Sequence, residues 1–363
     1  MKQLLAAATA SAFAAIAFTA IAFTATPGAA ADAPPPWAYG FTAPVPPGTP
    51  EAPPNPAQVL DAVTQHRLPG SAFSFARAQI SDRYGPADWF PEDHPAMPEI
   101  VARGRVTAQP QIYACSLCHY PNGKGRPENA NITGLTYEYF VQQMMDFRNG
   151  ARKTSDPRKA NTRLMTAFAQ TMTDEEIKAA AKYFTSMPAT PWIKVVESAT
   201  VPKTKPQNGI FLRLEGEEAG VEPIGERIIE TPEKTHDTEF LRNPRSGFIA
   251  HVPPGRLKKG EALVMSGITA DGSKVTACTV CHGGDLRGLG PVPTLAGRSP
   301  SYLMRQLYDM QRGTRNGAWT PLMASVVAHL GTEDSLTAAA YLSVAEAVGQ
   351  AMNRRSRRRM PPL

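Results

Sequence analysis

Two stretches of this sequence share one pattern: residues 115–119 read Cys-Ser-Leu-Cys-His and residues 278–282 read Cys-Thr-Val-Cys-His. Together they hold all four cysteines of the 363-residue chain. In an exported protein, four cysteines would first suggest disulfides, and paired cysteines can also bind zinc. A zinc site would have to draw on two widely separated pairs. A thioredoxin-like pair needs no following histidine and is expected near a βαβ pattern, which the sequence does not show.

Cys-x-x-Cys-His is the sequence that attaches haem c. Each thiol adds to one vinyl group of the haem, and the two intervening residues set the reach of the thiols. The adjacent histidine lies under the porphyrin and gives its nitrogen to the iron. The sequence therefore predicts two covalently bound haem c groups. The predicted attachment residues are Cys115, Cys118, Cys278 and Cys281, and the predicted iron ligands are His119 and His282.

The two motifs belong to a longer internal repeat. Cys115 and Cys278 are 163 positions apart. At the same spacing, residues 139–152 and 302–315 share Tyr, Gln, Asp, Gly and Arg in register, which is typical of a duplicated unit. Each segment has apolar residues at helical spacing and reaches a glycine near its end. Each therefore predicts an amphipathic helix with a C-terminal stop.

A further helix follows in each unit. In the first, Thr173 and Glu176 have the spacing of a capping box that opens an apolar helix face. In the second, residues 332–343 fill this role. The tyrosines of these helices, Tyr183 and Tyr341, are 158 positions apart, so about five residues are missing from the second unit's intervening loop. Two methionines that precede these helices, Met165 and Met323, have the same spacing.

Both units resemble class I cytochrome c domains, and the tandem is similar to the dihaem cytochrome c4 family. The motifs, the paired helices and the turn at 293–297 (Pro-Thr-Leu-Ala-Gly) carry the resemblance, over about 98–190 and 255–348. It implies a mainly α fold of two tandem domains. It also implies that Met165 and Met323 lie in loops and give each iron its second axial ligand. The alternative is that they are ordinary core methionines. Met144 and Met172 are the nearest competitors, and Met172 aligns with Leu330.

The resemblance also concerns the carbonyl that orients each iron-ligating histidine. In the family, the proline before the Leu-Ala-Gly turn accepts a hydrogen bond from the ring N–H, which orients the ring and tunes the metal. Pro293 fits this position, but its counterpart in the first unit is Ala130. We expect a less constrained turn there and different potentials for the two haems.

Segments outside the two units account for about half of the chain. The start has the layout of a secretory signal peptide, with Met-Lys, an apolar stretch from 4 to 25 and a run of alanines at 29–31. A retained membrane anchor is the alternative. Later stretches are too short or too polar to span a membrane. The predicted organisation is a signal peptide (1–31), a proline-rich N-terminal extension (32–97), haem domain 1 (98–190), a partly β inter-domain insertion (191–254), haem domain 2 (255–348) and a basic C-terminal tail (349–363).

The extension and the insertion have no counterpart in the resemblance. Residues 34–56 are expected to be extended and mostly unstructured. Residues 57–97, rich in aromatics and proline, are expected to cover apolar surface of haem domain 1. Strands are predicted at 192–196 and 210–214, with a third at 224–229. The insertion either braces the two domains or forms a docking surface for one particular partner.

The formal net charge of +6 is concentrated locally. Five arginines between 354 and 359 make the tail basic. We predict a solvated, disordered end. The alternative is electrostatic docking to an acidic partner or peripherally to an anionic membrane surface. Nucleic acid is not an expected partner of an exported protein.

Three functions are compatible with two attached haems. The first is a periplasmic electron carrier with both irons six-coordinate, serving a periplasmic dehydrogenase or a terminal oxidase. The second is a dihaem peroxidase with one open iron, for which His94 and His251 are the best distal candidates. The third is the cytochrome subunit of a dehydrogenase complex, with the insertion as its docking element. The matched methionine positions favour a carrier.

Overall fold

The computed structural model describes residues 33–53 and 59–359, and for 346–359 it describes the helical backbone alone. Residues 33–363 form one unit. The predicted signal peptide at 1–31 lies outside the described residues. None of the helices in the described part of the chain is long and apolar enough to cross a membrane.

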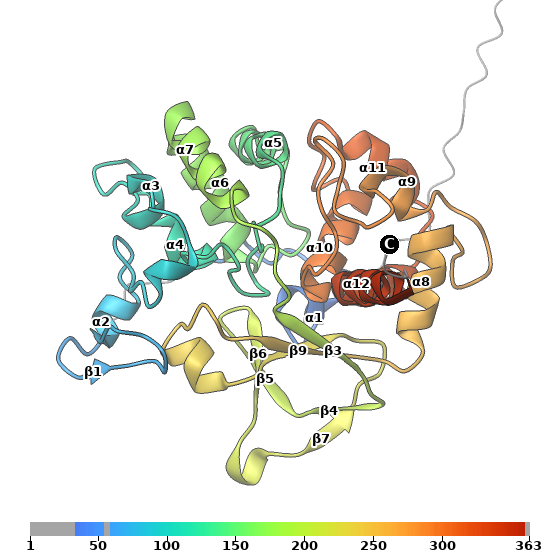
Figure 1. The fold of residues 1–363 in the computed structure, drawn as a ribbon, viewed down its shortest axis with the longest axis horizontal. Helices are drawn as coiled ribbons and strands as arrows, with labels where there is room; N and C mark the ends of the chain where they lie inside the picture. The colour runs from blue at the N-terminus through green and yellow to red at the C-terminus, as the bar shows by residue number, and fades with distance from the viewer. Residues whose placement is uncertain (1–32, 54–58, 360–363) are drawn as a thin grey trace, which may run out of the picture. The chain divides into compact units, whose positions relative to one another are not determined.

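The first repeat is a helical unit around its own apolar core (Figure 1). Thr136 caps its central helix by accepting a hydrogen bond from the amide of Tyr139. The predicted capping box at Thr173 and Glu176 is confirmed, with both reciprocal bonds formed. The helices are α3 (Glu99–Ala102), α4 (Cys115–His119), α5 (Tyr137–Arg148), α6 (Ala160–Thr171) and α7 (Asp174–Thr185).

The second repeat has the same order of helices but longer ends. Ser299 caps its central helix as Thr136 does in the first repeat. Its first and last helices cross closely at Gly260, where an added Cβ would lie 2.1 Å from the Thr337 carbonyl oxygen. The helices are α8 (Arg256–Ser266), α9 (Cys278–His282), α10 (Pro300–Gln311), α11 (Thr320–Val327) and α12 (Thr332–Arg359).

Two expectations about the helices of the repeats and the tail were wrong. Met165 and Met323 lie inside α6 and α11, not in loops. Neither stretch has a glycine, both contain Leu, Met and Ala, and the proline of α11 stands in its first turn, where proline is tolerated. The basic tail was predicted to be disordered, yet α12 continues through its arginines to Arg359. Alanine, glutamate, glutamine and arginine are strong helix formers, so this helix can extend beyond the last packed turn.

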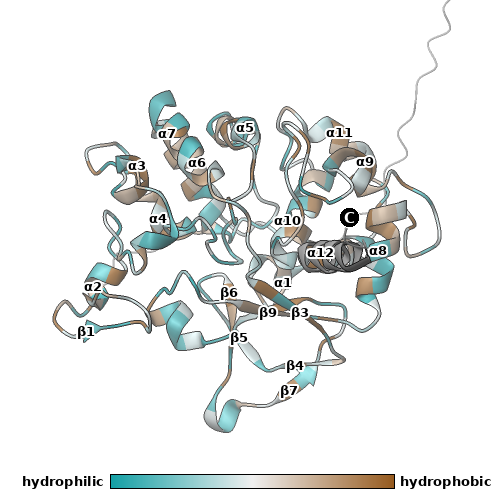
Figure 2. Cartoon of the chain, in the orientation of Figure 1, coloured by the Kyte–Doolittle hydropathy of each residue, from teal (hydrophilic) through white to brown (hydrophobic). Residues whose placement is uncertain are grey.

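The insertion is built from short strands. One three-stranded sheet has the order β3-β9-β8, with β3 parallel and β8 antiparallel to β9, and two hairpin-like pairs, β4–β7 and β5–β6, adjoin it. Strand β9 is largely hydrophobic in Figure 2 and buries Phe248, Ala250 and Val252. The strands are β3 (Ile193–Glu197), β4 (Thr200–Pro202), β5 (Thr204–Gln207), β6 (Ile210–Arg213), β7 (Val221–Pro223), β8 (Ile229–Pro232) and β9 (Phe248–Val252).

The third predicted strand, at 224–229, is a bend. Gly225 has φ +57°, which breaks an extended chain, and strands β7 and β8 lie on either side of it. Ile224 and Ile228 are still buried in the core of the second repeat. Their apolar character therefore reflects burial within the bend and not membership of a strand.

The beginning of the extension is not the unstructured linker that its prolines predicted. Pro36–Tyr39 form helix α1, whose aromatic residues Trp37 and Tyr39 are buried in the core shared by the second repeat and the insertion. The Tyr39 hydroxyl donates a 2.7 Å hydrogen bond to Asp309 of α10. These two aromatic side chains are buried against residues that lie far away in the sequence. That burial outweighs the local preference of a proline-rich segment for an extended conformation.

The rest of the extension contacts haem domain 1 and the insertion. It contains β1 (Gln65–His66), β2 (Phe75–Ala76) and α2 (Arg77–Ile80). Its buried Trp89 donates a 2.8 Å hydrogen bond to the Leu241 carbonyl oxygen of the insertion. Further along, the Arg83 carbonyl oxygen accepts from the amide of Ala114, directly before the first cysteine motif. The segment therefore joins the insertion to the first repeat.

Candidate haem sites

The two Cys-x-x-Cys-His motifs form matching one-turn helices followed by the same turn. In each, a glycine with positive φ, Gly125 or Gly288, donates its amide to the carbonyl oxygen of the motif histidine at 2.8 Å. The glycine is required because this turn needs a left-handed residue. The turn brings the chain back beneath the histidine ring, where it can present a backbone carbonyl.

Both histidines are oriented by that carbonyl, as predicted. The His119 ring Nδ1 lies 2.9 Å from the Ala130 carbonyl oxygen, and the His282 Nδ1 lies 2.8 Å from that of Pro293. With Nδ1 donating, Nε2 is left free to bind iron. Burial lowers the pKa of both imidazoles, which keeps them in the neutral form that ligates metals. The Ala130 carbonyl oxygen thus orients the His119 ring in the same way as the Pro293 carbonyl oxygen orients the His282 ring.

All four thiols are free, and each pair flanks its histidine. Burial raises the pKa of Cys115 to about 12 and of Cys278 to about 11. In the described part of the chain, no three His, Cys, Asp or Glu side chains gather as a metal site of their own. Within the described residues, the four cysteines thus form neither a disulfide nor a cluster of zinc ligands.

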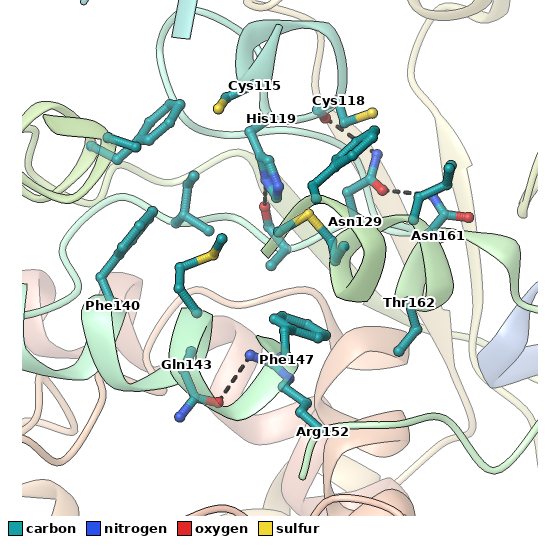
Figure 3. Close-up of a pocket in the computed structure, with 18 of the residues that line it drawn as sticks. Cys115, Cys118, His119, Asn129, Phe140, Gln143, Phe147, Arg152, Asn161 and Thr162 are labelled. Carbon is teal, nitrogen blue, oxygen red and sulfur yellow. Dashed lines mark hydrogen bonds between the residues drawn. The ribbon is translucent and has the colours of Figure 1, made fainter. Parts of the chain in front are cut away.

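Pocket 1 lies beside the first motif. Figure 3 shows His119 directed into it below Cys115 and Cys118, with Phe140 and Phe147 on the far side. The wall is mostly apolar. Side chains of α5, α6 and α7 form much of it, and residues of α10 such as Tyr302 and Gln306 complete it. Three methionines line it: Met144, Met165 and Met172.

Pocket 2 lies beside the second motif and is also mostly apolar. Cys278, Cys281 and His282 line it together with two methionines, Met310 and Met323. Met165 and Met323 thus share a pocket with the matching histidine. The aligned Met172 and Leu330 are both buried in the cores of their repeats, as predicted, and both also reach the pocket walls.

Each pair of thiols, its histidine and its apolar pocket fit a covalently bound haem. The thiols lie at the rim, the ring nitrogen faces inward, and aromatic and aliphatic side chains supply the low-dielectric surroundings that tune a haem iron. The donor chemistry of both sites is the same.

The pockets share one wall, where α5 and α10 meet. Arg152 of the first repeat donates to Tyr302 (3.2 Å) and Gln306 (3.0 Å) of the second. Reciprocally, Arg315 donates to Tyr139 (2.8 Å) and Gln143 (3.0 Å). The repeated Tyr, Gln and Arg positions were found in the sequence as a helix signature. Their part in joining the two domains was not predicted, because a repeat does not reveal which faces of its copies meet.

Comparison with known proteins agrees with this geometry. The cytochrome c family model matches residues 106–188. Cytochrome c-554(548) of Halomonas halodenitrificans is 38% identical over 74 residues, which cover 20% of this chain and 89% of that protein. This chain belongs to the cytochrome c family.

Other relatives span both domains of this cytochrome. Cytochrome c4 of Azotobacter vinelandii is 23% identical, over 67% of this chain and 89% of that protein. The thiosulfate dehydrogenase electron acceptor of Thiomonas intermedia (strain K12) is 23% identical, over 66% of this chain and 81% of that protein. The protein is therefore a tandem cytochrome c with two class I domains, two haem c groups and a resemblance to cytochrome c4.

Proposed function

We propose that this protein is an exported, periplasmic electron carrier whose two haem irons are held by His119 with Met165 and by His282 with Met323. The observation that carries the proposal is the shared wall between the pockets. Tyr139, Gln143, Tyr302 and Gln306 each line both pockets. Two redox centres separated by one layer of side chains suit the passage of an electron through the molecule.

The bound haem supplies a one-electron iron couple, and the chain's own residues provide the surroundings that such a couple needs. The backbone carbonyls of Ala130 and Pro293 hold the ligating rings in a single orientation. The apolar walls exclude water and limit the rearrangement of dipoles when the charge changes. Arg152 and Arg315 donate hydrogen bonds across the domain interface, and these bonds help to hold the pocket walls together.

The two histidines considered as distal groups of a peroxidase belong to the extension and the insertion. His94 is bound to Asp88 in the extension, at 3.1 Å, and His251 belongs to strand β9 of the insertion. Among the residues that the structure describes, neither lines either pocket. This supports a carrier over a peroxidase, which needs an acid–base group beside an open iron.

The relatives suggest the kind of partner. One of them is named as the electron acceptor of a thiosulfate dehydrogenase. We therefore propose a periplasmic dehydrogenase as electron donor and a terminal oxidase as acceptor. Co-purification of a dehydrogenase with this cytochrome would distinguish a dedicated subunit from a freely diffusing carrier.

Optical spectra of the holoprotein test the ligand assignment. Methionine ligation gives the oxidised protein a sulfur-to-iron band at about 695 nm, and a closed iron does not bind carbon monoxide. We expect the Met165→Ala and Met323→Ala variants each to lose half of this band and to bind one carbon monoxide per molecule.

Other methionines of the same pockets provide matched controls. Met144→Leu and Met310→Leu keep the volume and apolar character of each wall, so the band should keep its full intensity. Half-intensity in the unmodified protein, or carbon monoxide binding to it, would overturn the carrier proposal in favour of an open iron.

A further inference from the structure

The two haem-attachment helices have different surroundings. We call the candidate haem site of the first repeat site 1 and that of the second repeat site 2. At site 1 the insertion covers α4. The Arg242 guanidinium donates to the Leu117 carbonyl oxygen between the two thiols, and it lies 5.5 Å from the centroid of the Tyr120 ring. Close by, Arg126 is buried between Glu128 and Glu239, the latter from the insertion. The surface that carries the first motif is therefore closed by other parts of the same chain.

At site 2 the equivalent surface is open and apolar. Val280, which matches Leu117, is 67% exposed, and Leu289, which matches Arg126, is 58% exposed. Neither lines pocket 2. Trp319 and Leu322, which do line that pocket, are 50% and 65% exposed. Of the four motif cysteines, Cys281 is the exposed one.

These four residues define the site 2 apolar patch: Val280, Leu289, Trp319 and Leu322. Val280 lies on α9 and Leu289 on the loop after it, while Leu322 lies on α11 and Trp319 directly precedes that helix. Trp319 and Leu322 line pocket 2 together with Cys281 and His282 of the second motif. The loop between Val280 and Leu289 also carries the exposed Asp285 and Arg287, which pair with each other at 3.9 Å. An apolar centre with a mixed-charge rim is the composition of a transient protein interface.

We propose that the site 2 apolar patch is the docking surface for an external redox protein that presents its own apolar rim around a cofactor, and that site 1 exchanges electrons with such partners only through site 2. The inference rests on the proposed carrier function. Electron transfer requires close approach of two centres, and within the described part of the chain the attachment helix at site 2 is the one that is open to a second protein. At site 1, Arg242 and Glu239 already occupy the corresponding surface.

A redox-inactive probe tests docking without electron transfer. We would use the zinc-substituted form of a small blue-copper protein whose exposed histidine ligand is ringed by apolar side chains. Added to the isotopically labelled holocytochrome, it should shift the backbone amide resonances of residues 279–290 and 318–323. Shifts centred on residues 113–126 would overturn the proposal, as would the absence of any localised shifts.

The reduced copper form of the same probe tests the electron route. One electron leaves Cu(I) and reduces one ferric haem iron. We expect the double variant Val280→Ser with Leu289→Ser to slow this bimolecular reaction roughly tenfold, because the patch loses its central apolar contacts. If the double variant binds fewer than two haems, Leu289→Gln, which lies outside the attachment motif, replaces it.

Matched controls separate docking from general damage. Val221→Ser changes an equally exposed valine (64%) on strand β7 of the insertion and should leave the rate unchanged. Hexaammineruthenium(II), a small hydrophilic reductant, should reduce all variants at the rate of the unmodified protein. Equal rates with the copper probe in the double variant and Val221→Ser would overturn the proposal. Carbon monoxide binding by the unmodified protein would instead overturn the underlying carrier function.

Discussion

The two haem domains carry the same site in different surroundings. In both, a glycine turn returns the chain so that a backbone carbonyl binds the ring of His119 or His282, and the methionine stands in the matching helix. Around site 1, however, the insertion and the extension cover the attachment helix, and the insertion adds a buried ion pair. Around site 2 the corresponding surface is apolar and exposed. Duplication thus preserves the chemistry of the iron, while segments outside the repeat determine which copy can meet a partner.

The largest effect is expected when the buried cluster of Arg126, Glu128 and Glu239 near site 1 is disrupted. Arg126→Met removes the cation between Glu128 and Glu239 and leaves uncompensated buried carboxylates, which should cost about 3–5 kcal/mol of unfolding free energy. Denaturant unfolding of the holoprotein measures this loss. The matched change in domain 2, Leu289→Ser, should cost less than about 0.5 kcal/mol because its side chain is exposed. Equal losses would contradict the contrast between the two surfaces.

A second prediction concerns the longer helix pair of domain 2. Gly260→Ala would place a methyl group 2.1 Å from the Thr337 carbonyl oxygen, where α8 crosses α12. We expect a loss of about 1–3 kcal/mol in thermal or denaturant unfolding. Gly284→Ala, whose Cβ would meet nothing within 4 Å, is the control. Domain 1 has Met97 at the corresponding position, so it should not share this sensitivity.

A third prediction sharpens the electrostatic difference between the sites. Arg242 places a partly buried positive charge against the first attachment loop, which favours the reduced state of that site. Arg242→Gln should therefore lower the potential of site 1 by an amount equivalent to about 1 kcal/mol, read from a spectroscopic redox titration. Arg287→Gln beside site 2 should shift its potential less, because water and salt screen that exposed group. A larger shift of the potential at site 2 would contradict the expectation that the Arg242 charge raises the potential of site 1.

The smallest expected effect is the pH dependence of local stability in the extension, where His94 pairs with Asp88. Burial lowers the pKa of His94, but hydrogen bonds to Asp88 and to the Pro95 carbonyl oxygen outweigh it, so the pKa is raised in the folded state. Stability from this pair is therefore fully present below the unfolded pKa of about 6.5 and is lost as pH rises through the folded value. We expect a fraction of a kcal/mol.

Hydrogen exchange of residues 83–97 across this pH range measures the local effect. Protection should fall as pH rises, after correction for the intrinsic exchange rate. His94→Gln should abolish the pH dependence while His329→Gln, on the surface of domain 2, retains it. The opposite slope would show that burial, and not Asp88, controls the pKa of His94.

Much of each haem site could be predicted because its determinants are local in sequence. In each unit, five consecutive residues predict the attachment and the first iron ligand, and the Thr173 capping box acts across three residues. The repeat spacing paired Met165 with Met323 without any knowledge of the fold. The helical state of both methionines was missed, because the resemblance suggested a loop where the residues themselves favour a helix.

The sequence by itself determined two haems and a mainly helical tandem, and it predicted the residues that attach the haems. Only the tertiary structure decided that the proline-rich start buries Trp37 and Tyr39 beneath domain 2, that Arg152 and Arg315 cross between the domains, and that Arg242 covers site 1. These contacts join residues far apart in the chain. Their free energy comes from burial and charge pairing, which no local pattern encodes.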